Sequence, residues 1–406
     1  MIPLLAWRNL WRHPRRTLLT ILAIAFASAV LVFFVGLQYS SYDTSINASI
    51  RLLSGHLQVQ QRGYNDRPEL RLSIPGSVIL EDKIRSLPDV TAVTRRSIGF
   101  AILSSEDRSY GAQIVGVEAA NEGKLSTIPG VIRSGRYLTD DSALEIVIGK
   151  ALAQNLKVAI GDDLTLLGQG RDGSLAATVL PVVGIFETGG QDLDRHVAHI
   201  PIETFDETFG MEGQVHALVV SLTGLESIPL TKSHIDKLLT EPTLVTLTWE
   251  ELLPGIKQSI ELDMAGGWLF YISLILIVLC TILNTFLMSI LERTKEFAVM
   301  LALGSTPSRI IRLVLLECFL LTMNGIIIGI IVGSAFLVYF GVHGFTVPGS
   351  EEFTKVWNLP NAVYTKLTLR AVGTAPLIIL ISTLIAVLYP TLRIRQLEPT
   401  ESMRGR

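Results

Sequence analysis

Charged side chains are scarce in this chain of 406 residues, and cysteines are scarcer still. Asp, Glu, Lys and Arg make up 17% of the sequence, whereas soluble domains contain about 25%. The net charge is −3, which gives the chain no basic excess of the kind that binds nucleic acid. The two cysteines, Cys280 and Cys318, lie within apolar runs, which excludes a disulfide framework. Because 49% of the residues are apolar, the chain has too much to bury to be disordered.

The few charges are unevenly distributed, and four stretches contain none. These stretches are residues 17–42, 264–291, 318–349 and 371–392. Each is longer than the roughly 18 to 20 residues that a helix needs to cross a bilayer. We therefore predict four transmembrane helices, over residues 17–42, 264–291, 310–340 and 371–392. The first resembles a secretory signal, but its apolar run is too long for one, so we expect an uncleaved anchor.

Basic residues beside the apolar stretches predict the orientation in the membrane. They gather before the first helix, between the second and third, and after the fourth: Arg8, Arg12, Arg15, Arg16, Arg293, Lys295, Arg309, Arg312, Arg393, Arg395, Arg404 and Arg406. Both termini are then cytoplasmic. So are the N-terminal segment of residues 1–16, the loop of residues 292–309 and the tail of residues 393–406. Residues 43–263 and a short loop of residues 341–370 then lie outside the cytoplasm.

The outer segment of residues 43–263 has the composition of a soluble α/β domain. Runs that favour strands alternate with helical patterns and are separated by turn signals. The strand-like runs are residues 57–60, 114–117, 145–148, 182–185 and 217–220, and the helix-like runs are residues 80–87, 150–156 and 232–239. We predict a large mixed-sheet α/β domain inserted between helices 1 and 2 of an α-helical membrane protein. We also consider a division of this domain into two lobes near residues 125–140.

Motifs for catalysis or metal binding are weak in this sequence. Residues 130–137 resemble a phosphate-binding loop, but Arg136 and Tyr137 replace its lysine and its serine or threonine. No G-x-S-x-G or H-E-x-x-H pattern occurs. Residues 192–199 contain two aspartates and two histidines, but an extended chain would direct His196 and His199 to opposite faces. We therefore expect a solvated, substrate-facing loop there, no metal site and no enzymatic activity in this chain.

The N-terminal segment has the pattern of a helix that lies along the inner leaflet. Its apolar residues fall on one side of a helix and its arginines on another: Leu4, Trp7, Leu10 and Trp11 against Arg8, Arg12 and Arg15. Trp at headgroup depth and Arg near anionic lipid favour an interfacial helix, which Pro14 would end. A simple basic flank of the first membrane helix is the alternative.

Glycines at a spacing of four residues mark one face of the third predicted helix. Gly325, Gly329 and Gly333 form a stripe that lets another helix approach closely. The partner helix belongs either to this chain or to a second subunit. We expect Asn284 and Asn324 to form hydrogen bonds between helices, because an unpaired amide is costly in lipid.

The cytoplasmic loop contains a strongly helix-forming segment, residues 292–304. Phe297, Met300, Leu301 and Gly304 lie on one face of this helix, and the Gly304-Ser305-Thr306-Pro307 sequence would end it. An apolar ridge that faces the cytosol requires a partner. The alternative is a loop that packs against its own helical bundle.

This segment resembles the coupling helix of ABC transporter permeases of the MacB, lipoprotein-releasing and FtsX type, whose pattern is E-R-x-x-E-[FI]-[AG]-x-[ML]-[KR]-A-[LI]-G. The chain departs at Leu301, where the family has a basic residue, and matches at Glu292, Arg293, Glu296, Phe297, Ala298, Met300, Ala302, Leu303 and Gly304. Trp7-Arg8-Asn9-Leu10, Ser54-Gly55-His56-Leu57 and residues 390–404 are similar to other family motifs. The resemblance covers the whole chain and is closest to the lipoprotein-releasing (LolC/LolE-like) branch.

The resemblance implies a permease subunit of the bacterial inner membrane without its own motor. Two permease subunits, identical or different, would bind a cytoplasmic ABC ATPase dimer, which would hold ATP and Mg²⁺, so this chain needs no cofactor. The ATPase-coupling residues would be Glu292, Arg293, Glu296, Phe297, Met300, Leu301 and Gly304. ATP hydrolysis would then perform conformational work in the periplasmic domain (mechanotransmission), and a periplasmic carrier or adaptor would be a further partner.

The lipoprotein-releasing branch implies a lipoprotein or lipid-like substrate. Exposing an acyl chain costs about 0.8 kcal/mol per CH₂, so extraction needs an apolar shelter between helices 1 and 2. Five aromatic residues near the outer ends of these helices form either an interfacial belt or a lipid gate: Phe33, Phe34, Trp268, Phe270 and Tyr271. MacB-like tripartite efflux and FtsX-like activation of a periplasmic partner are alternatives on the same scaffold.

Two other classes of protein are weighed against a permease. A membrane receptor would signal through its cytoplasmic loop, but the coupling motif predicts a bound ATPase instead. A membrane-embedded enzyme is disfavoured because ionisable residues are scarce within the predicted helices. Glu317 is the candidate there, and we expect it either to pair with Arg309 or Arg312 or to extend its carboxylate to the membrane interface (snorkel).

Overall fold

The computed structural model describes residues 2–346, 349 and 362–392. The chain forms two compact units. The first, called the helical unit, comprises Met1–Asp43, Ile260–Val347 and Ala362–Arg406, and the second, called the sheet unit, comprises Thr44–Ser259 and Pro348–Asn361. The predicted C-terminal motif of residues 390–404 falls almost entirely outside the described residues, as do the predicted tail of residues 393–406 and most of the loop before residue 362.

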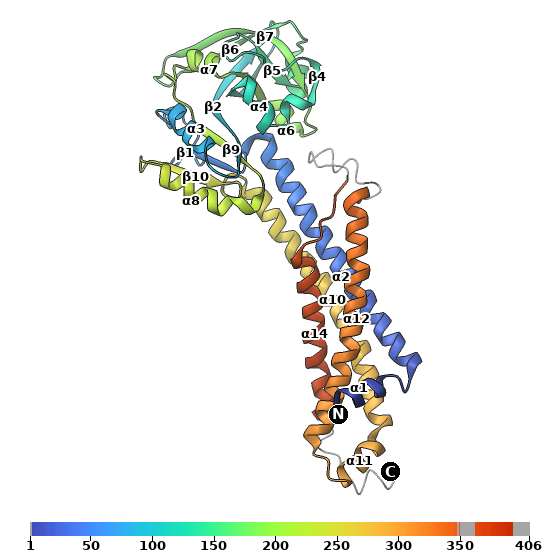
Figure 1. Ribbon diagram of the computed structural model, residues 1–406. Helices are drawn as coiled ribbons and strands as arrows, with labels where there is room; N and C mark the ends of the chain where they lie inside the picture. The colour runs from blue at the N-terminus through green and yellow to red at the C-terminus, as the bar shows by residue number, and fades with distance from the viewer. Residues whose placement is uncertain (1, 347–348, 350–361, 393–406) are drawn as a thin grey trace. The chain divides into compact units, whose positions relative to one another are not determined.

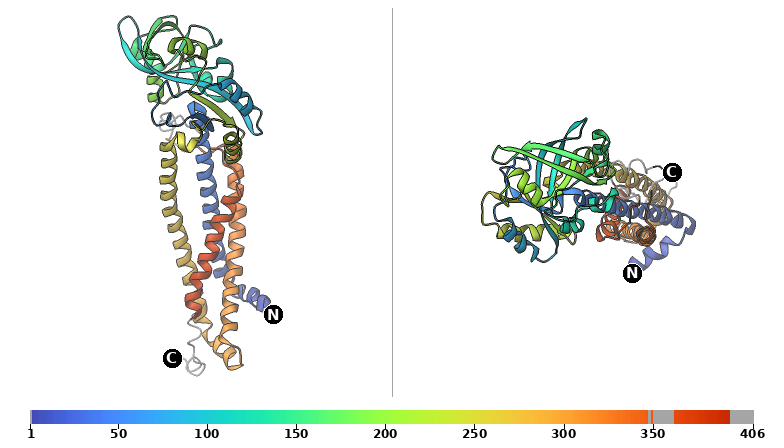
Figure 2. Two further views of the ribbon diagram at one scale, coloured as in Figure 1. Left: turned by 90° about the vertical axis from the view of Figure 1, so that its left-hand side faces the viewer. Right: turned by 90° about the horizontal axis from the view of Figure 1, so that it is seen from above.

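Four long helices dominate the described part of the chain (Figure 1). They are α2 (Pro14–Ser49), α10 (Pro254–Glu292), α12 (Pro307–His343) and α14 (Leu369–Leu392). Each is long and apolar enough to cross a membrane. Three of them begin at a proline, which suits the first helical position because the N–H that proline lacks has no partner there. Within the helical unit they run side by side (Figure 2).

The glycine stripe of α12 lies against α2 of the same chain. A Cβ added to Gly329 would lie 2.5 Å from the Cβ of Ser28 and 2.7 Å from the Ala25 carbonyl oxygen. Gly325 and Gly333 meet α2 equally closely, at Ile24 and Val32. The stripe therefore brings two backbones together within one chain. The expected bond of Asn324 to another helix is wrong, because its amide donates to the Leu320 carbonyl of its own helix at 2.7 Å.

The sheet unit is built on one mixed sheet of ten strands. The strands are β1 (Leu57–Gln61), β2 (Val90–Ser104), β3 (Ser109–Val117), β4 (Ile132–Gly135), β5 (Ile146–Gly149), β6 (Asp163–Gln169), β7 (Leu175–Phe186), β8 (Val197–Pro201), β9 (Ala217–Leu222) and β10 (Leu244–Thr248). Their order is β10-β1-β9-β2-β3-β8-β5-β7-β4, with β6 paired to β2 and β7. The β3–β8 and β5–β7 pairs are parallel and the others antiparallel. The predicted fold class, four apolar helices with a mixed-sheet domain, is confirmed.

Short helices cover the sheet: α3 (Ser77–Arg85), α4 (Ala119–Leu125), α5 (Lys150–Leu156), α6 (Gln191–His196), α7 (Ile202–Phe209), α8 (Ile228–Leu238) and α9 (Trp249–Leu252). The rings of Phe205 and Phe209 on α7 stack with their centroids 4.3 Å apart and belong to the main apolar core of this unit. The division into two lobes near residues 125–140 is wrong. It fails because β9, late in this domain, pairs with both β1 and β2 and so joins early and late segments of the domain in one sheet.

The end of α2 is fastened to the sheet unit by backbone hydrogen bonds. A π-helical turn, Ile50–Ser54, follows α2 and ends at Gly55, whose φ of +66° disfavours any side chain. In this turn the Ile50 carbonyl accepts the π-helical bond from Gly55 N at 2.8 Å. The next two carbonyls, of Arg51 and Leu52, accept bonds from Thr127 N at 2.9 Å and from Ser126 Oγ at 3.1 Å. His56 then bonds to β9 through its backbone N–H and its Nδ1. The Ser54-Gly55-His56-Leu57 motif is therefore an anchor between helix and sheet.

The acidic and histidine-containing segment of residues 192–199 is not the solvated loop that we expected. It forms the end of α6 and the start of β8. His199 is fully buried, and its Nδ1 lies 2.8 Å from the hydroxyl of Tyr137. Burial and the nearby charge of Arg96 lower the pKa of His199 to about 3. Among the described residues there is no cluster of three or more His, Cys, Asp or Glu that could hold a metal ion.

A Gly329→Ala substitution should destabilise the helical unit. The added methyl would meet backbone and Cβ atoms of α2, and overpacking of this kind costs about 1–3 kcal/mol. Thermal unfolding of the purified protein in detergent should show a lower Tm. Gly373→Ala on α14 is the matched control, because a Cβ there meets nothing within 4 Å. Equal Tm changes for the two variants would contradict the α2–α12 contact.

A second prediction concerns acid stability of the sheet unit. His199 is neutral when folded, with a pKa lowered to about 3, whereas its unfolded pKa is about 6.5, so the unfolded state takes up a proton as the pH falls below 6.5. Stability should therefore fall between about pH 6.5 and pH 3, by up to about 1.4 kcal/mol per pH unit. His216, with a pKa lowered by burial to about 4, adds to the same trend.

His199→Asn should reduce the slope of the unfolding free energy against pH, because about one proton fewer is taken up on unfolding. The measurement is thermal unfolding at several pH values, followed by tryptophan fluorescence. The slope against pH is the readout, because the smaller side chain also lowers stability at every pH. His196→Asn, at an exposed position of the same segment, is the control. An unchanged slope in His199→Asn would show that this imidazole does not titrate on unfolding.

Candidate functional site

The predicted coupling segment forms a separate short helix, α11 (Thr294–Ala302), between α10 and α12. Arg293 interrupts the helical path before it, with φ −98° and ψ 9°. Gly304, with φ +89°, ends it, because the N–H groups of Gly304 and Ser305 bond back to the carbonyls of Leu301 and Met300 at 3.0 Å each. This pattern of bonds explains the need for glycine at the end of the motif.

The apolar ridge of α11 faces the chain's own helices. Phe297 is fully buried and belongs to the same core as Ile290 of α10 and Ile310 of α12. Met300 and Leu301 are half-buried against this core. The prediction that these three residues face the cytosol is therefore wrong, although their helical spacing is right. α11 therefore covers the apolar core between α10 and α12.

A different face of α11 carries the exposed apolar side chains. Leu303, directly after the helix, is 82% exposed, and Val299, one turn earlier, is also exposed. Lys295 and Glu296 are exposed as well, and so is Gly304. In the sequence, Leu303 was identified only as a match to the family motif and not as a surface residue.

Glu317 joins three elements at this end of the helical unit. It lies on α12 and is only 5% exposed. Asn9 of α1 (Ile2–Leu10) donates its amide to Oε1 at 2.7 Å, and Arg293 Nη1 donates to Oε2 at 2.9 Å. The expected pairing of Glu317 with Arg309 or Arg312 is therefore wrong, since the partner comes from the α10–α11 junction.

Further ion pairs connect the N-terminal segment with the coupling helix. Arg12 donates to both carboxylate oxygens of Glu296 at 3.0 Å, and Arg16 donates to Glu292 at 3.0 Å. Arg293 also donates from Nε to Glu296 at 3.3 Å. The pairs of Arg12 with Glu296 and of Arg16 with Glu292 are partly exposed, so each stabilises the fold only weakly, by up to about 1 kcal/mol. Their importance is geometric, because they surround a polar cavity of about 390 Å³ that also contacts Asn9 and Glu317.

The residues that sequence reasoning missed at this site have recognisable signals. Asn9 stands in the Trp7-Arg8-Asn9-Leu10 motif, and Glu317 is a carboxylate next to a long apolar run. Arg12 and Arg16 appeared only as basic flank residues. Of the predicted interfacial face, Leu4, Trp7 and Trp11 are exposed, whereas Leu10 is buried in the helical core.

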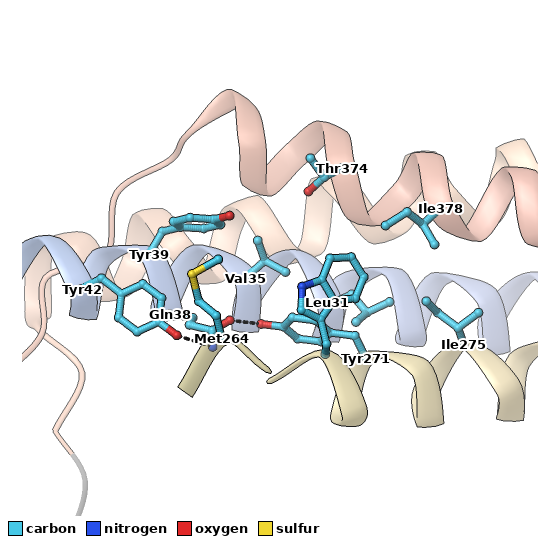
Figure 3. A pocket seen from close by; sticks show the side chains of 11 residues that line it. Leu31, Val35, Gln38, Tyr39, Tyr42, Met264, Tyr271, Ile275, Thr374 and Ile378 are labelled. Atoms are coloured by element: carbon cyan, nitrogen blue, oxygen red, sulfur yellow. Dashed lines mark hydrogen bonds between the residues drawn. The ribbon is translucent and has the colours of Figure 1, made fainter. Parts of the chain in front are cut away.

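The five residues of the predicted aromatic gate form one series of ring contacts in the helical unit, with centroids 5.4–6.3 Å apart, in the order Phe33, Phe34, Phe270, Tyr271 and Trp268. Trp268 and Tyr271 line a pocket of about 210 Å³ between α2, α10 and α14 (Figure 3). Phe33 instead packs with Phe336, Phe340 and Phe345, at centroid distances of 5.6–6.1 Å. Phe34 contacts Phe270 at 5.4 Å. The pocket also contains residues that the sequence did not single out: Leu31, Val35, Gln38, Tyr39, Tyr42, Met264, Ile275, Thr374 and Ile378.

One end of this pocket is polar and the rest is apolar. Gln38 lies between Tyr42 and Tyr271, donating its amide N–H to the Tyr42 hydroxyl at 2.7 Å and accepting from the Tyr271 hydroxyl (Figure 3). The Tyr42 hydroxyl donates to Asp263 at 2.6 Å. The walls are formed by aliphatic side chains such as Leu31, Val35 and Ile275. Such a pocket suits an apolar chain that ends in a polar group.

An exposed apolar patch lies on one face of the sheet unit. Ile102 of β2 pairs directly with Leu167 of β6, and side chains alternate between faces, so Phe100, Leu175 and Val179 share this face. All five are exposed. We call them the β2–β6–β7 patch. Apolar side chains gathered on one sheet face are typical of a surface that binds a partner.

Both units of this chain are similar to known protein families. Residues 17–238 match the MacB-like periplasmic core domain family, and residues 268–399 match the FtsX-like permease C-terminal family. The chain is 22% identical over 397 residues to the lipoprotein-releasing system transmembrane protein LolC of Xylella fastidiosa strain Temecula1, covering 95% of this chain and 92% of that protein.

Two further comparisons involve MacB. The chain is 24% identical over 376 residues to the macrolide export ATP-binding/permease protein MacB of Vibrio parahaemolyticus, covering 89% of this chain and 55% of MacB. It therefore spans about half the length of that relative. The crystal structure of the periplasmic region of MacB from Actinobacillus actinomycetemcomitans matches 50% of this chain and 92% of that chain, at 16% identity and a TM-score of 0.37.

Proposed function

Since this chain belongs to the family of ABC transporter permeases with a MacB-like periplasmic core domain and an FtsX-like permease domain, we propose that it extracts lipoproteins from the inner membrane, driven by a separate ATPase subunit. The observation that carries the proposal is the similarity along nearly the whole chain to a lipoprotein-releasing permease. MacB, by contrast, has about half of its length outside the match. The chain would be oriented with both termini and α11 in the cytoplasm.

The pocket of the helical unit supports a lipid-like substrate. Its aliphatic walls would shelter part of an acyl chain, at about 0.8 kcal/mol for each CH₂ kept from water. The polar end, with Gln38, Tyr42 and Tyr271, would face the glyceride oxygens or the first residues of the lipoprotein. Trp268 and Tyr271 would then contact substrate directly, whereas Phe33 would support α2 through its aromatic neighbours.

The exposed side of α11 supports docking of an ATPase dimer. An apolar side chain as exposed as Leu303 on a cytoplasmic helix end is unfavourable unless a partner covers it. Leu303 and Val299 would insert into a groove of the motor, and Glu296 and Lys295 would lie at the rim. Phe297, Met300 and Leu301 would contribute indirectly, because they hold α11 against α10 and α12.

Two further partners complete the proposed machine. A second permease subunit, identical or different, would pair with this chain, so that two coupling helices meet two ATPase subunits. A periplasmic carrier with an apolar surface would dock on the β2–β6–β7 patch and accept the released lipoprotein. The alternative, tripartite efflux with a periplasmic adaptor, is supported by the MacB-like domain match.

Leu303→Asp should detach the ATPase. Docking would bury the new carboxylate in an apolar groove, which is strongly unfavourable. Gentle purification of the tagged protein from native membranes, followed by quantitative mass spectrometry, should recover an ATPase and a second permease with the wild type. Leu303→Asp should recover at least tenfold less ATPase.

Leu230→Asp is the control, because Leu230 is also exposed but lies on α8 of the sheet unit. Phe297 is unsuitable for this test, since truncating a fully buried Phe costs about 3–5 kcal/mol in stability. Undiminished ATPase recovery with Leu303→Asp would rule out this docking face. Absence of any ATPase from the wild type would rule out the transporter and favour a receptor.

Ile378→Trp should block the substrate pocket. The indole would fill the space between α2, α10 and α14, so acyl-modified proteins labelled with radioactive palmitate should no longer co-purify. Ile385→Trp, at an exposed position of the same helix, should retain them. Recovery of a periplasmic adaptor without labelled proteins from the wild type would instead establish the efflux alternative.

A further inference from the structure

The buried carboxylate of Glu317 has no part in ATPase docking or in the substrate pocket as proposed above. Removing an ionised carboxylate from water costs several kcal/mol unless its oxygens are paired. Here both are paired, Oε1 with the Asn9 amide at 2.7 Å and Oε2 with Arg293 at 2.9 Å. Neither partner lies on α12, so the carboxylate joins elements that are distant in sequence.

Arg293 occupies the junction at which the chain leaves α10 and enters α11. α10 ends at Glu292 and α11 begins at Thr294, and the backbone of Arg293 is outside the helical region. Its guanidinium bonds to Glu317 and Glu296 and lies over the ring of Phe297, 5.2 Å from the centroid. Glu296 and Phe297 lie on α11 and Glu317 lies on α12, so a rotation of α11 about this junction would separate Arg293 from one side or the other.

The N-terminal segment braces the same junction from the other side. Asn9 holds Glu317, and Arg12 holds Glu296, so α1 and the turn after it touch both carboxylates that contact Arg293. A continuous series of contacts therefore links α1, α11 and α12, in the order Asn9, Glu317, Arg293, Glu296 and Arg12.

Stability alone does not account for this arrangement. Replacing a buried ion pair by apolar residues of similar volume is often neutral or stabilising, because desolvation offsets most of the attraction. An ion pair does fix the relative position of its two side chains. The side chains alone are 7% exposed for Glu317 and 13% exposed for Arg293, so solvent screens their charges little.

We propose that Glu317 is a positioning residue, which locks the α10–α11 junction through Arg293 with α1 as a brace, so that a displacement of α11 moves α10 and α12 as one body. This inference rests on the proposed function, in which the ATPase moves α11. A free junction would absorb that displacement by rotation at Arg293. With the lock in place, the movement passes to the long helices.

The first test measures the junction itself in the full-length protein in lipid nanodiscs. Glu317→Gln keeps the shape and an acceptor for Asn9 but removes the charge that binds Arg293. Hydrogen exchange of the α11 amides should become at least tenfold faster, while that of the outer half of α12 stays unchanged. Glu250→Gln is the control, since Glu250 forms an exposed ion pair with Lys257 at 2.8 Å.

Unchanged exchange in α11 would overturn the proposal, and so would an equal rise in all helices, because the latter indicates general destabilisation. If Glu317→Gln does not fold, Asn9→Ala replaces it, which leaves the ion pair and removes the brace. Exchange in α11 should then rise by a smaller factor, and no rise would overturn the role of α1.

The second test measures transmission in the complex with the co-purified ATPase. Trapping with ATP and vanadate should change hydrogen exchange in the sheet unit of the wild type. In Glu317→Gln the ATPase should remain bound and hydrolyse ATP, but the change in the sheet unit should fall at least fivefold. A full response would overturn the positioning role. A wild type without bound ATPase would refute the proposed function but leave the result of the first test standing.

Discussion

The close contact between α2 and α12 is the constraint on which the helical unit depends. Gly325, Gly329 and Gly333 leave no side chains on one face of α12, so its backbone lies against Ile24, Ser28 and Val32 of α2. The same pair of helices is fixed again further along, where Gly36 lies against Leu337 and where Phe33 packs with Phe336 and Phe340. Contacts at several turns leave the two helices little freedom to slide, because packed interfaces resist gradual deformation. They act as one rigid pair.

The two ends of this pair differ in chemistry. At one end the contacts are ionic and polar, and Glu317, Arg293 and Glu296 tie the short helices α1 and α11 to α12. Toward the other end α2 instead faces a largely apolar pocket, whose polar groups are confined to Gln38 and its tyrosine partners. Polar bonds fix geometry at the end where a motor would act, and an adaptable apolar wall lies where an acyl chain would be held. The proposed function requires this distribution, because the ATPase would act at the polar end and the acyl chain would bind at the apolar end.

Much of the fold could be predicted from the sequence, because its determinants are local. A long charge-free run predicts a membrane helix by itself, and all four such runs lie largely on long apolar helices. Each strand-like run that was identified overlaps a strand of the sheet. The errors arose where distant segments meet. The helical period placed Phe297, Met300 and Leu301 on one face correctly, but it carries no information on whether that face meets solvent or α10 and α12. Likewise, no spacing rule indicates that Glu317 pairs with Arg293 and not with the nearby Arg309. His199 was expected in a solvated loop, but it lies on β8 opposite Val115 of β3 and Val147 of β5, and the local sequence does not indicate these distant neighbours.

In the proposed function a displacement of α11 would pass along the long helices, and sequence motifs fix the chain at two junctions on this path. At the junction of α10 and α11, Asn9 and Arg293 belong to motifs far apart in the chain, and they meet at one carboxylate. Where α2 enters the sheet unit, the carbonyls of the π-turn accept bonds from Gly55 N, Thr127 N and Ser126 Oγ, and His56 continues the attachment to β9. A side chain at Gly55 would lie 2.5 Å from Val219 and would be strained at a positive φ, so the attachment tolerates only glycine. A loose junction would dissipate a displacement as local rotation, and in the proposed function the residues at these two junctions would prevent it.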